Sequence, residues 1–305
     1  MTSRLRASLA FLTTALYAFC YVAIKAGLPY APPLRFAALR AVLAGVTVLA
    51  FVAATGQAIL PPRRLLGGIF VVAAAGTTLG FGAMFLSPGR SGAGLASVLG
   101  NTTPLLAIVL AALVLKERVT RPKAVALAVG FAGAAIIAVR GGAAAGWSGF
   151  GGTLIPLIAA SAIATESVAV KRLGLGDAVL RVAGWQLLLG SVPLFAVSAW
   201  LEVDARIGWT PTFLGLLLFV AVPGTAVATS LWYWLVQGDE VGRLSLYLFL
   251  VPVLGLALGA ALFGERLGVP EIAGIGLILI GIAAAMRDAP SQADAVATST
   301  HEFPS

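Results

Sequence analysis

The sequence predicts an all-α membrane protein of ten transmembrane helices, arranged as two inverted five-helix repeats. Three observations predict this fold class: an apolar composition, ten apolar windows long enough to cross a bilayer, and a second half that repeats the first. Hydrophobic residues make up 60% of the 305 residues and charged residues only 10%. Soluble domains carry about 25% charged residues, so this chain has too few charges for a water-facing surface and needs lipid around it.

The composition also excludes several functional classes. The single cysteine, Cys20, cannot form an internal disulfide, and the only histidine, His301, lies near the C-terminus. Histidine-based zinc sites and Ser–His or Cys–His catalytic pairs are therefore not expected. The glycine-rich stretches lack the G-K-[ST] ending of a phosphate-binding loop, and no G-x-S-x-G occurs. We predict a protein that is not an enzyme and that binds no metal and no cofactor.

The net charge of +8 does not indicate a nucleic-acid partner, because the basic residues are scattered at helix ends and form no stripe. Control of membrane topology by lysine and arginine explains them better. Arg4, Arg6 and the apolar run after them resemble a signal peptide, but no A-x-A cleavage site follows. We therefore interpret this run as the first membrane helix, and we expect the lipid bilayer as a partner.

Each crossing requires about 20 predominantly apolar residues. Pro33, Pro122, Pro211 and Pro270 lie near the starts of such windows, where a missing N–H is tolerated. The ten windows are residues 9–27, 34–54, 66–86, 93–115, 122–139, 151–170, 179–200, 211–236, 243–263 and 269–287.

A shift of 148 residues aligns the two halves of the chain. It places Gly76-Thr77 on Gly224-Thr225, Pro104 on Pro252, and the E-R-x-x-x-P motif that begins at Glu117 on the one that begins at Glu265. A shift of 146 aligns Lys25 with Lys171 and Arg35 with Arg181. The predicted units are residues 1–145 (first repeat), 146–287 (second repeat) and 288–305, a polar tail that we expect to be disordered and cytoplasmic.

Five helices per repeat is an odd number, so the second repeat enters the membrane in the opposite orientation. With the N-terminus assigned to the cytoplasm, the inner side carries 13 lysines and arginines and the outer side six, leaving Arg40 uncounted. This asymmetry predicts an inner-membrane protein that crosses the bilayer many times and has both termini in the cytoplasm. Inverted repeats are typical of secondary transporters, although some channels also have them.

Three long stretches of the chain resemble a known family. They are YAFCYVAIKAGLPYAPPLRFAALR, PLLAIVLAALVLKERVTRPKAVALAVGFAGAAII and its repeat PVLGLALGAALFGERLGVPEIAGIGLILIGIAAA. They are similar to EamA-type transporters of the drug/metabolite transporter (DMT) superfamily, and the resemblance covers residues 8–287. It implies ten helices, a central cavity between the halves, and export of amino acids or other small metabolites. The chain departs from the family pattern at Tyr17 and Cys20.

Three charged residues in or near predicted spans are candidate functional residues, because such groups usually face a cavity or a partner. Lys25 lies close enough to the outer boundary either to anchor the helix there, as we also expect for Arg35, or to reach the cavity. Arg40 lies six or seven residues into the second span, which at 1.5 Å per residue is roughly 10 Å from the membrane boundary. It either binds a carboxylate of the substrate or is a structural charge. Glu166 is the candidate for proton coupling. Its alternative is a helix-end acid that contacts Lys171 or Gln186.

Polar groups and prolines at matching places in the two halves indicate a substrate cavity. Asn101, Thr102 and Pro104 fall within the fourth span and Pro252 within the ninth. A proline inside a helix exposes backbone polar groups, so both sites either line a cavity or form packing kinks. Aromatic residues are further cavity candidates, with the interfacial aromatic belt as the alternative: Tyr17, Tyr21, Trp185, Trp232, Tyr233 and Tyr247. Trp147, Trp200 and Trp209 fit that belt better.

Two glycine pairs, Gly76-x-x-x-Gly80 and Gly255-x-x-x-Gly259, predict close helix packing inside the bundle and, as a second possibility, oligomerisation. We expect a monomer or a weak homo-oligomer with a small-molecule substrate. The predicted function is secondary active export by alternating access. The alternatives are a nucleotide-sugar or organic-phosphate exchanger, a passive channel and an intramembrane enzyme.

Overall fold

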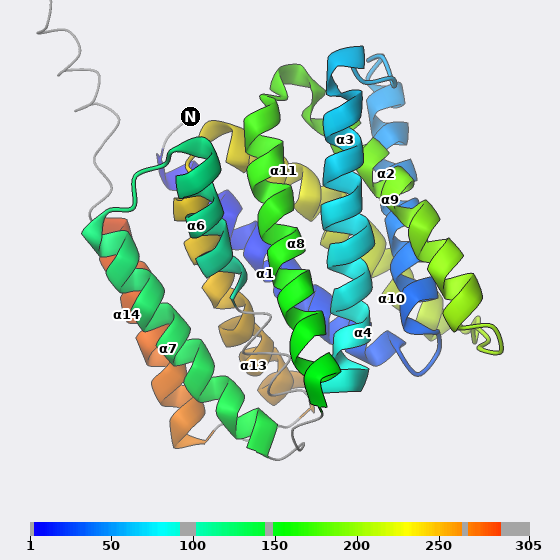
Figure 1. The fold of residues 1–305 in the computed structure, drawn as a ribbon. Helices are drawn as coiled ribbons and strands as arrows, with labels where there is room; N and C mark the ends of the chain where they lie inside the picture. The colour runs from blue at the N-terminus through cyan, green and yellow to red at the C-terminus, as the bar shows by residue number, and fades with distance from the viewer. Residues whose placement is uncertain (1–2, 92–101, 144–148, 264–267, 288–305) are drawn as a thin grey trace, which may run out of the picture.

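A computed structural model of the chain describes residues 3–91, 102–143, 149–263 and 268–287, and within these ranges all regular structure is helical (Figure 1). The first half contains α1 (Ser3–Gly27), α2 (Pro33–Ala54), η1 (Arg63–Leu65), α3 (Leu66–Val72), η2 (Ala73–Phe81), α4 (Gly82–Ser91), α6 (Thr103–Leu115) and α7 (Arg121–Ala143). The second half contains α8 (Gly149–Leu173), η3 (Gly176–Ala178), α9 (Val179–Leu201), α10 (Pro211–Ala221), η4 (Val222–Val227), α11 (Ala228–Gly238), α12 (Val241–Ser245), η5 (Leu246–Phe249), α13 (Leu250–Phe263) and α14 (Val269–Arg287).

The helices coincide with the predicted windows wherever the chain is described. Within the described residues, six helical runs are long and apolar enough to cross a membrane: residues 4–27, 33–54, 63–87, 154–173, 176–201 and 211–238. Shorter apolar helices include 103–115, 241–255 and 272–281. The protein is therefore an all-α membrane protein, as predicted from its composition. Residues 93–101 of the fourth window and the tail 288–305 lie outside the described residues, and the count of ten spans stays a prediction.

Proline marks four helix starts, as predicted. Pro33 and Pro211 are the first residues of α2 and α10, and Pro122 and Pro270 are the second residues of α7 and α14. The first N–H groups of a helix have no intrahelical acceptor, so a proline loses nothing there.

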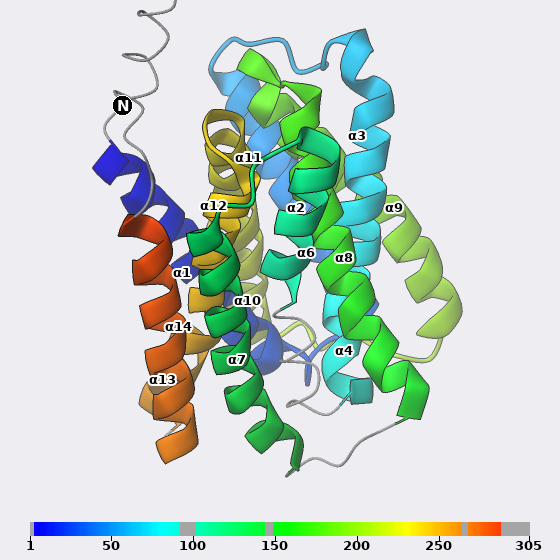
Figure 2. The same ribbon diagram turned by 60° about the vertical axis from the view of Figure 1, so that its left-hand side comes forward.

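Small residues bring neighbouring helices close together. α7 and α14 lie side by side at one edge of the bundle in both ribbon views (Figures 1 and 2). A Cβ on Gly133 would lie 2.6 Å from the Gly274 carbonyl oxygen, and one on Gly281 would lie 3.0 Å from the Ala126 carbonyl oxygen. The 148-residue shift relates the two contacts, since it aligns Gly133 with Gly281 and Ala126 with Gly274. Side chains larger than glycine would separate this pair.

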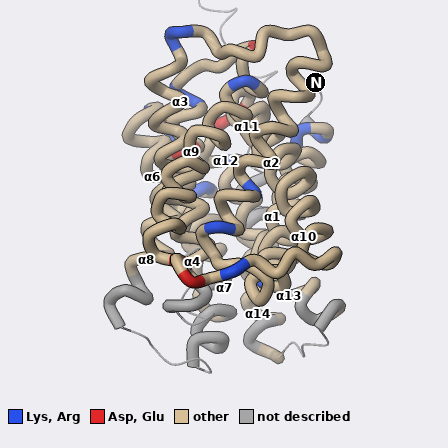
Figure 3. The backbone as a smooth tube through the Cα atoms, turned by 90° about the vertical axis from the view of Figure 1, so that its right-hand side faces the viewer, with Lys and Arg blue, Asp and Glu red and all other residues tan. Residues whose placement is uncertain are grey.

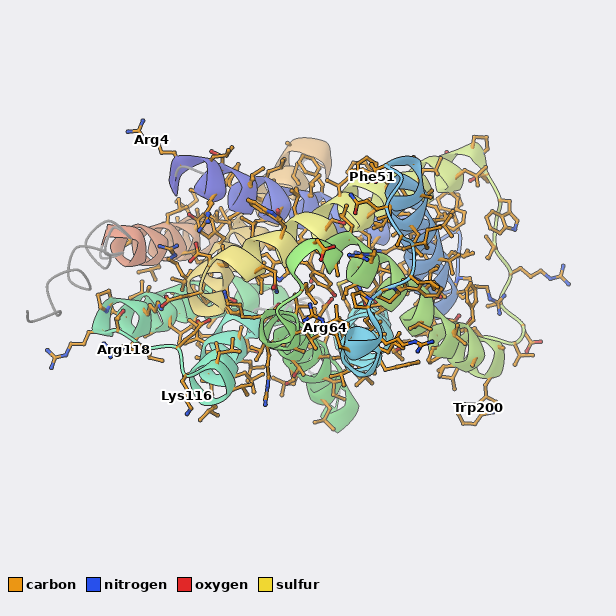
Figure 4. The ribbon with its side chains drawn as sticks, turned by 90° about the horizontal axis from the view of Figure 1, so that it is seen from above. Arg4, Phe51, Arg64, Lys116, Arg118 and Trp200 are labelled. Atoms are coloured by element: carbon orange, nitrogen blue, oxygen red, sulfur yellow. The ribbon has the colours of Figure 1, made fainter. Side chains whose placement is uncertain are left out.

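The exterior is apolar along most of its length. Figure 3 shows long uncharged stretches between short charged segments. Large apolar side chains face outward, including Trp200 at 78% exposure, and Figure 4 shows Trp200 pointing away from the bundle. Arg4, Lys116 and Arg118 also project outward, on the opposite side of this view from Trp200 (Figure 4). Lipid is the solvent that fits such a surface.

Candidate functional site

A cavity lies between the two halves of the bundle and contains about 870 Å³ of empty space, its open mouth included. Helical spacing explains the lining: α1 contributes Tyr17, Cys20, Tyr21 and Ile24, which share one face at i, i+3, i+4 and i+7. α11 contributes Thr229, Trp232 and Tyr233 in the same way. The other lining residues are Arg40, Phe81, Met84, Thr103, Pro104, Ile163, Glu166, Leu248 and Val251.

Glu166 on α8 is held at the cavity by Tyr233. The Tyr233 hydroxyl donates a hydrogen bond of 2.5 Å to Glu166 Oε1. Gly76 makes room for the acid, because a Cβ at that position would overlap the carboxyl group. The predicted alternative partners are wrong: Lys171 donates to the Asp239 carbonyl at 2.8 Å, and Gln186 accepts a bond of 2.7 Å from the Thr77 hydroxyl.

Arg40 on α2 is 97% buried and lines the same cavity, with 3% of its surface exposed. Its Nε donates a hydrogen bond of 2.5 Å to Thr225 Oγ1, and its guanidinium carbon lies 4.3 Å from the centre of the Phe81 ring. Arg40 makes no ion pair with Glu166 in the described part of the chain, in agreement with the different depths that the sequence predicts for them.

Tyr17 connects the surroundings of the two charged groups. Its hydroxyl shares a hydrogen bond with Thr229 and lies within electrostatic range of both Glu166 and Arg40. The Trp232 indole nitrogen donates a hydrogen bond of 3.0 Å to the Ser167 hydroxyl, which fixes the orientation of this large ring at the cavity. Aromatic and hydroxyl groups from α1 and α11 therefore line the space around the acid and the arginine.

Both charged residues contact π-helical segments, which are rare and occur frequently at functional sites. η2 contains Gly76-Thr77 and η4 contains Gly224-Thr225, the pairs that the 148-residue shift aligns. The 146-residue shift also aligns Arg40 with Gln186 and Cys20 with Glu166.

These aligned positions make equivalent contacts across the two halves. Arg40 of the first half contacts Thr225 of the second, as Gln186 of the second contacts Thr77 of the first. A Cβ on Gly224 would overlap Cys20 Sγ, as one on Gly76 would overlap Glu166. The same pattern of contacts thus occurs once around η2 and once around η4. At each pair of aligned positions only one residue is charged: Arg40 is aligned with Gln186, and Glu166 with Cys20.

Seven of the predicted site residues line this cavity: Tyr17, Tyr21, Arg40, Pro104, Glu166, Trp232 and Tyr233. Lys25 is exposed and does not line it, and Arg35 donates to the carbonyl of Ala205; the anchoring of both at the outer boundary stays a prediction. Trp185 donates to the Ile59 carbonyl, and Tyr247 and Thr102 also lie outside the lining. Asn101 lies outside the described residues, as does the side chain of Pro252.

The two prolines are not placed as kinks inside continuous α-helices. Pro104 is the second residue of α6, and Pro252 is the third residue of α13. In the second half, the 3₁₀ segment η5 precedes the proline and divides the ninth window. Pro104 therefore occupies a first turn, where no N–H is needed, whereas Pro252 follows a 3₁₀ break in the helical run 241–263, an interruption of the kind expected for the ninth span.

The turn between α11 and α12, residues 238–240, is held by groups from several helices. Arg6 on α1 donates to the Gly238 carbonyl at 2.7 Å, and Lys171 on α8 donates to the Asp239 carbonyl. Lys123 on α7 forms an ion pair with Glu240. Glu117 of the E-R-x-x-x-P motif accepts bonds from the first backbone N–H groups of α12, at 2.9 and 3.0 Å. The turn is thereby fastened at the end of the bundle where the chain begins.

Glu240→Lys is expected to loosen this turn, because it places two ammonium groups together. The reporter is a cysteine at the fully buried Val241, in a protein whose Cys20 is replaced by alanine. The rate of thiol labelling at this cysteine should rise roughly two- to fivefold, because the lost Lys123–Glu240 ion pair is worth up to about 1 kcal/mol. The charge swap Lys123→Glu, Glu240→Lys should restore slow labelling. Equal rates in all three proteins would show that the ion pair does not fasten the turn.

The cavity, its helical walls and the apolar exterior fit a membrane transporter, and comparison with known proteins shows that class. The EamA-like transporter family model matches residues 5–139 and again residues 150–287, so the chain belongs to the EamA-like transporter family. This confirms the family assigned from the sequence. The family and the names of the relatives indicate a transporter and not an enzyme.

Several relatives cover nearly the whole chain. A Salmonella typhimurium protein named "Probable amino-acid metabolite efflux pump" is 30% identical over 92% of this chain and 94% of its own length. An uncharacterized transporter of Archaeoglobus fulgidus is 27% identical over 90% of this chain and 96% of its own length. A solved crystal structure shares the fold, with a TM-score of 0.80 and 18% identity, and covers 94% of this chain and 98% of the solved one.

Three residues at the site were not predicted from the sequence: Cys20, Thr225 and Thr229. The spacing of Tyr17 and Tyr21 predicts Cys20 on the same face, and the spacing of Trp232 and Tyr233 predicts Thr229. Thr225 belongs to the Gly-Thr pair that is repeated in the two halves, so the internal repeat could have predicted its place at the site.

Proposed function

We propose that the protein is a secondary active exporter of amino acids or other small metabolites, which works by alternating access of ten helices in two inverted five-helix repeats. The observation that carries this proposal is the pair of equivalent contacts around η2 and η4. Each contact joins one half to the other beside a shared cavity. Halves that exchange such contacts can expose a cavity to each side of the membrane in turn.

Glu166 is the proton-coupling residue in this proposal. It is the single acid among the described residues that line the cavity, and Tyr233 orients it. Burial makes the ionised form of a carboxyl group costly, so substrate binding and a change in water access can load or release its proton. An intramembrane enzyme has less support, because the described lining residues include no second acid and no histidine.

Export is tested by metabolite toxicity. Cells that overexpress the protein should resist toxic concentrations of one or a few amino acids or related metabolites, and cells with the vector alone should not. Radiolabelled compound loaded into the resistant cells should leave faster than from the vector control. Equal efflux from both, for every compound to which resistance is found, would contradict the proposed direction of transport.

The inverted topology has a separate test, in a Cys20→Ala background. Cysteines introduced at positions 144 and 204 should react with an impermeant thiol reagent from outside the cell. Cysteines at positions 120 and 295 should react only after permeabilisation, because the proposal places them with both termini in the cytoplasm of the inner membrane. Labelling of positions 120 and 144 from the same side would exclude five helices in the first repeat.

A further inference from the structure

The structure assigns a charge selector to the cavity: we propose that Arg40 binds the carboxylate of a small organic acid whose remaining part is apolar. This inference rests on the proposed transport function, since it specifies the substrate of the same cavity. It is carried by the unsatisfied hydrogen-bonding capacity of one buried guanidinium group, by its neutral counterpart in the other half, and by the composition of the cavity wall.

The Arg40 guanidinium is buried without an acid partner. Within the described residues no carboxylate lies at ion-pair distance, and Nη1 has no hydrogen-bond partner. Its Nε bond goes to a neutral hydroxyl, and Phe81 and Phe85 lie 4.3 and 5.7 Å from the guanidinium carbon. Aromatic faces stabilise a cation only partly, and an unpaired charge away from water is strongly unfavourable. A bound anion would satisfy the group.

The positive charge is not required for helix packing at this position. Gln186, at the aligned position of α9, is completely buried and accepts a hydrogen bond from the Thr77 hydroxyl, where Arg40 donates one to Thr225, and its amide nitrogen has no partner. A neutral amide therefore suffices to join this helix to its π-helical neighbour. The positive charge of Arg40 is therefore available to bind an anion, because the contact between the helices does not need it.

Beside its tyrosine, threonine and Glu166 groups, the described wall is largely apolar, which favours a ligand with a single negative charge and an apolar portion. Arg40 is the single cation among the described lining residues, and Ile24, Phe81, Met84, Leu248 and Val251 are apolar. Arginine forms directional bonds to a carboxylate, whereas a phosphate ester with two charges needs additional cations. The cavity thus favours a monocarboxylate over the sugar nucleotides and organic phosphates considered above.

The test measures binding without any gradient, on purified protein in lipid nanodiscs. The probes are straight and branched monocarboxylates of four to ten carbons, each compared with its isosteric neutral amide at matched ionic strength. At least one acid should raise the unfolding temperature of the wild type, and its amide should not. Arg40→Gln should bind that acid about 10- to 100-fold more weakly, the loss expected for one hydrogen bond to a charged group.

Two controls separate binding from folding. Ligand-free Arg40→Gln should unfold at or above the wild-type temperature, because it removes an unpaired buried charge and its counterpart Gln186 shows that glutamine fits at such a position. Arg40→Lys keeps the charge and should retain part of the preference for acid over amide. Equal effects of acid and amide, no effect of any acid, or wild-type affinity in Arg40→Gln would each overturn the assignment. Gradient-driven export could still be found in that case, so the two proposals fail separately.

Discussion

Glu166→Gln is expected to abolish accumulation driven by a pH gradient in proteoliposomes, down to the level of protein-free vesicles, while substrate exchange at equal pH continues at close to the wild-type rate. Glutamine has nearly the same size and still accepts the hydrogen bond from Tyr233, but it cannot carry a proton between the two sides of the membrane. Coupling is therefore lost while binding and the conformational change remain.

The control for this variant is protein abundance. A purely structural role of Glu166 predicts fewer molecules in the membrane, each with the wild-type response to pH. Rates are therefore expressed per molecule of reconstituted protein. If the glutamine variant accumulates substrate at the wild-type rate and with the wild-type pH profile, Glu166 does not couple protons.

Gly76→Ala is expected to have the second large effect, because the added methyl group would occupy the space of the Glu166 carboxyl group. Overpacking of this kind costs about 1–3 kcal/mol, so the unfolding temperature should fall. The acid should also be displaced from Tyr233, so that gradient-driven transport falls further than protein abundance does.

Two further variants make this result specific. Gly67→Ala, at a position where a Cβ would meet nothing within 4 Å, should leave stability and transport near the wild type. The double variant Gly76→Ala, Glu166→Ala gives the methyl group room and should recover stability relative to Gly76→Ala, but not coupled transport. Destabilisation of the double variant equal to that of Gly76→Ala would show that Glu166 is not the colliding group.

The sequence predicts the helices and most of the cavity faces, because these depend on local patterns. Apolar windows give the spans, and prolines give four helix starts. Helical spacing places Tyr17 and Tyr21 on one face of α1. Glu166 is recognisable as a candidate since an acid within a span is rare.

The contacts between the helices could not be predicted from local patterns. Tyr233 lies 67 residues from Glu166, and Thr225 lies 185 residues from Arg40, so both contacts depend on how the helices pack. The prediction of Gln186 as a partner of Glu166 was wrong for this reason. Lys171 lies five residues after Glu166 on the same helix, a spacing that does not place two side chains together, and it bonds to the turn between α11 and α12. The π-helical form of η2 and η4 likewise has no separate signal in a single sequence, apart from the repeated Gly-Thr pair.

Uphill transport by the wild-type protein tests the central claim most directly. Proteoliposomes that contain the protein and an imposed pH gradient should accumulate a substrate found by the toxicity screen above its concentration in the medium. Collapse of the gradient by a protonophore should release the excess. A passive channel would instead equilibrate the compound to the external concentration whether or not the gradient is present, and that result would contradict secondary active transport.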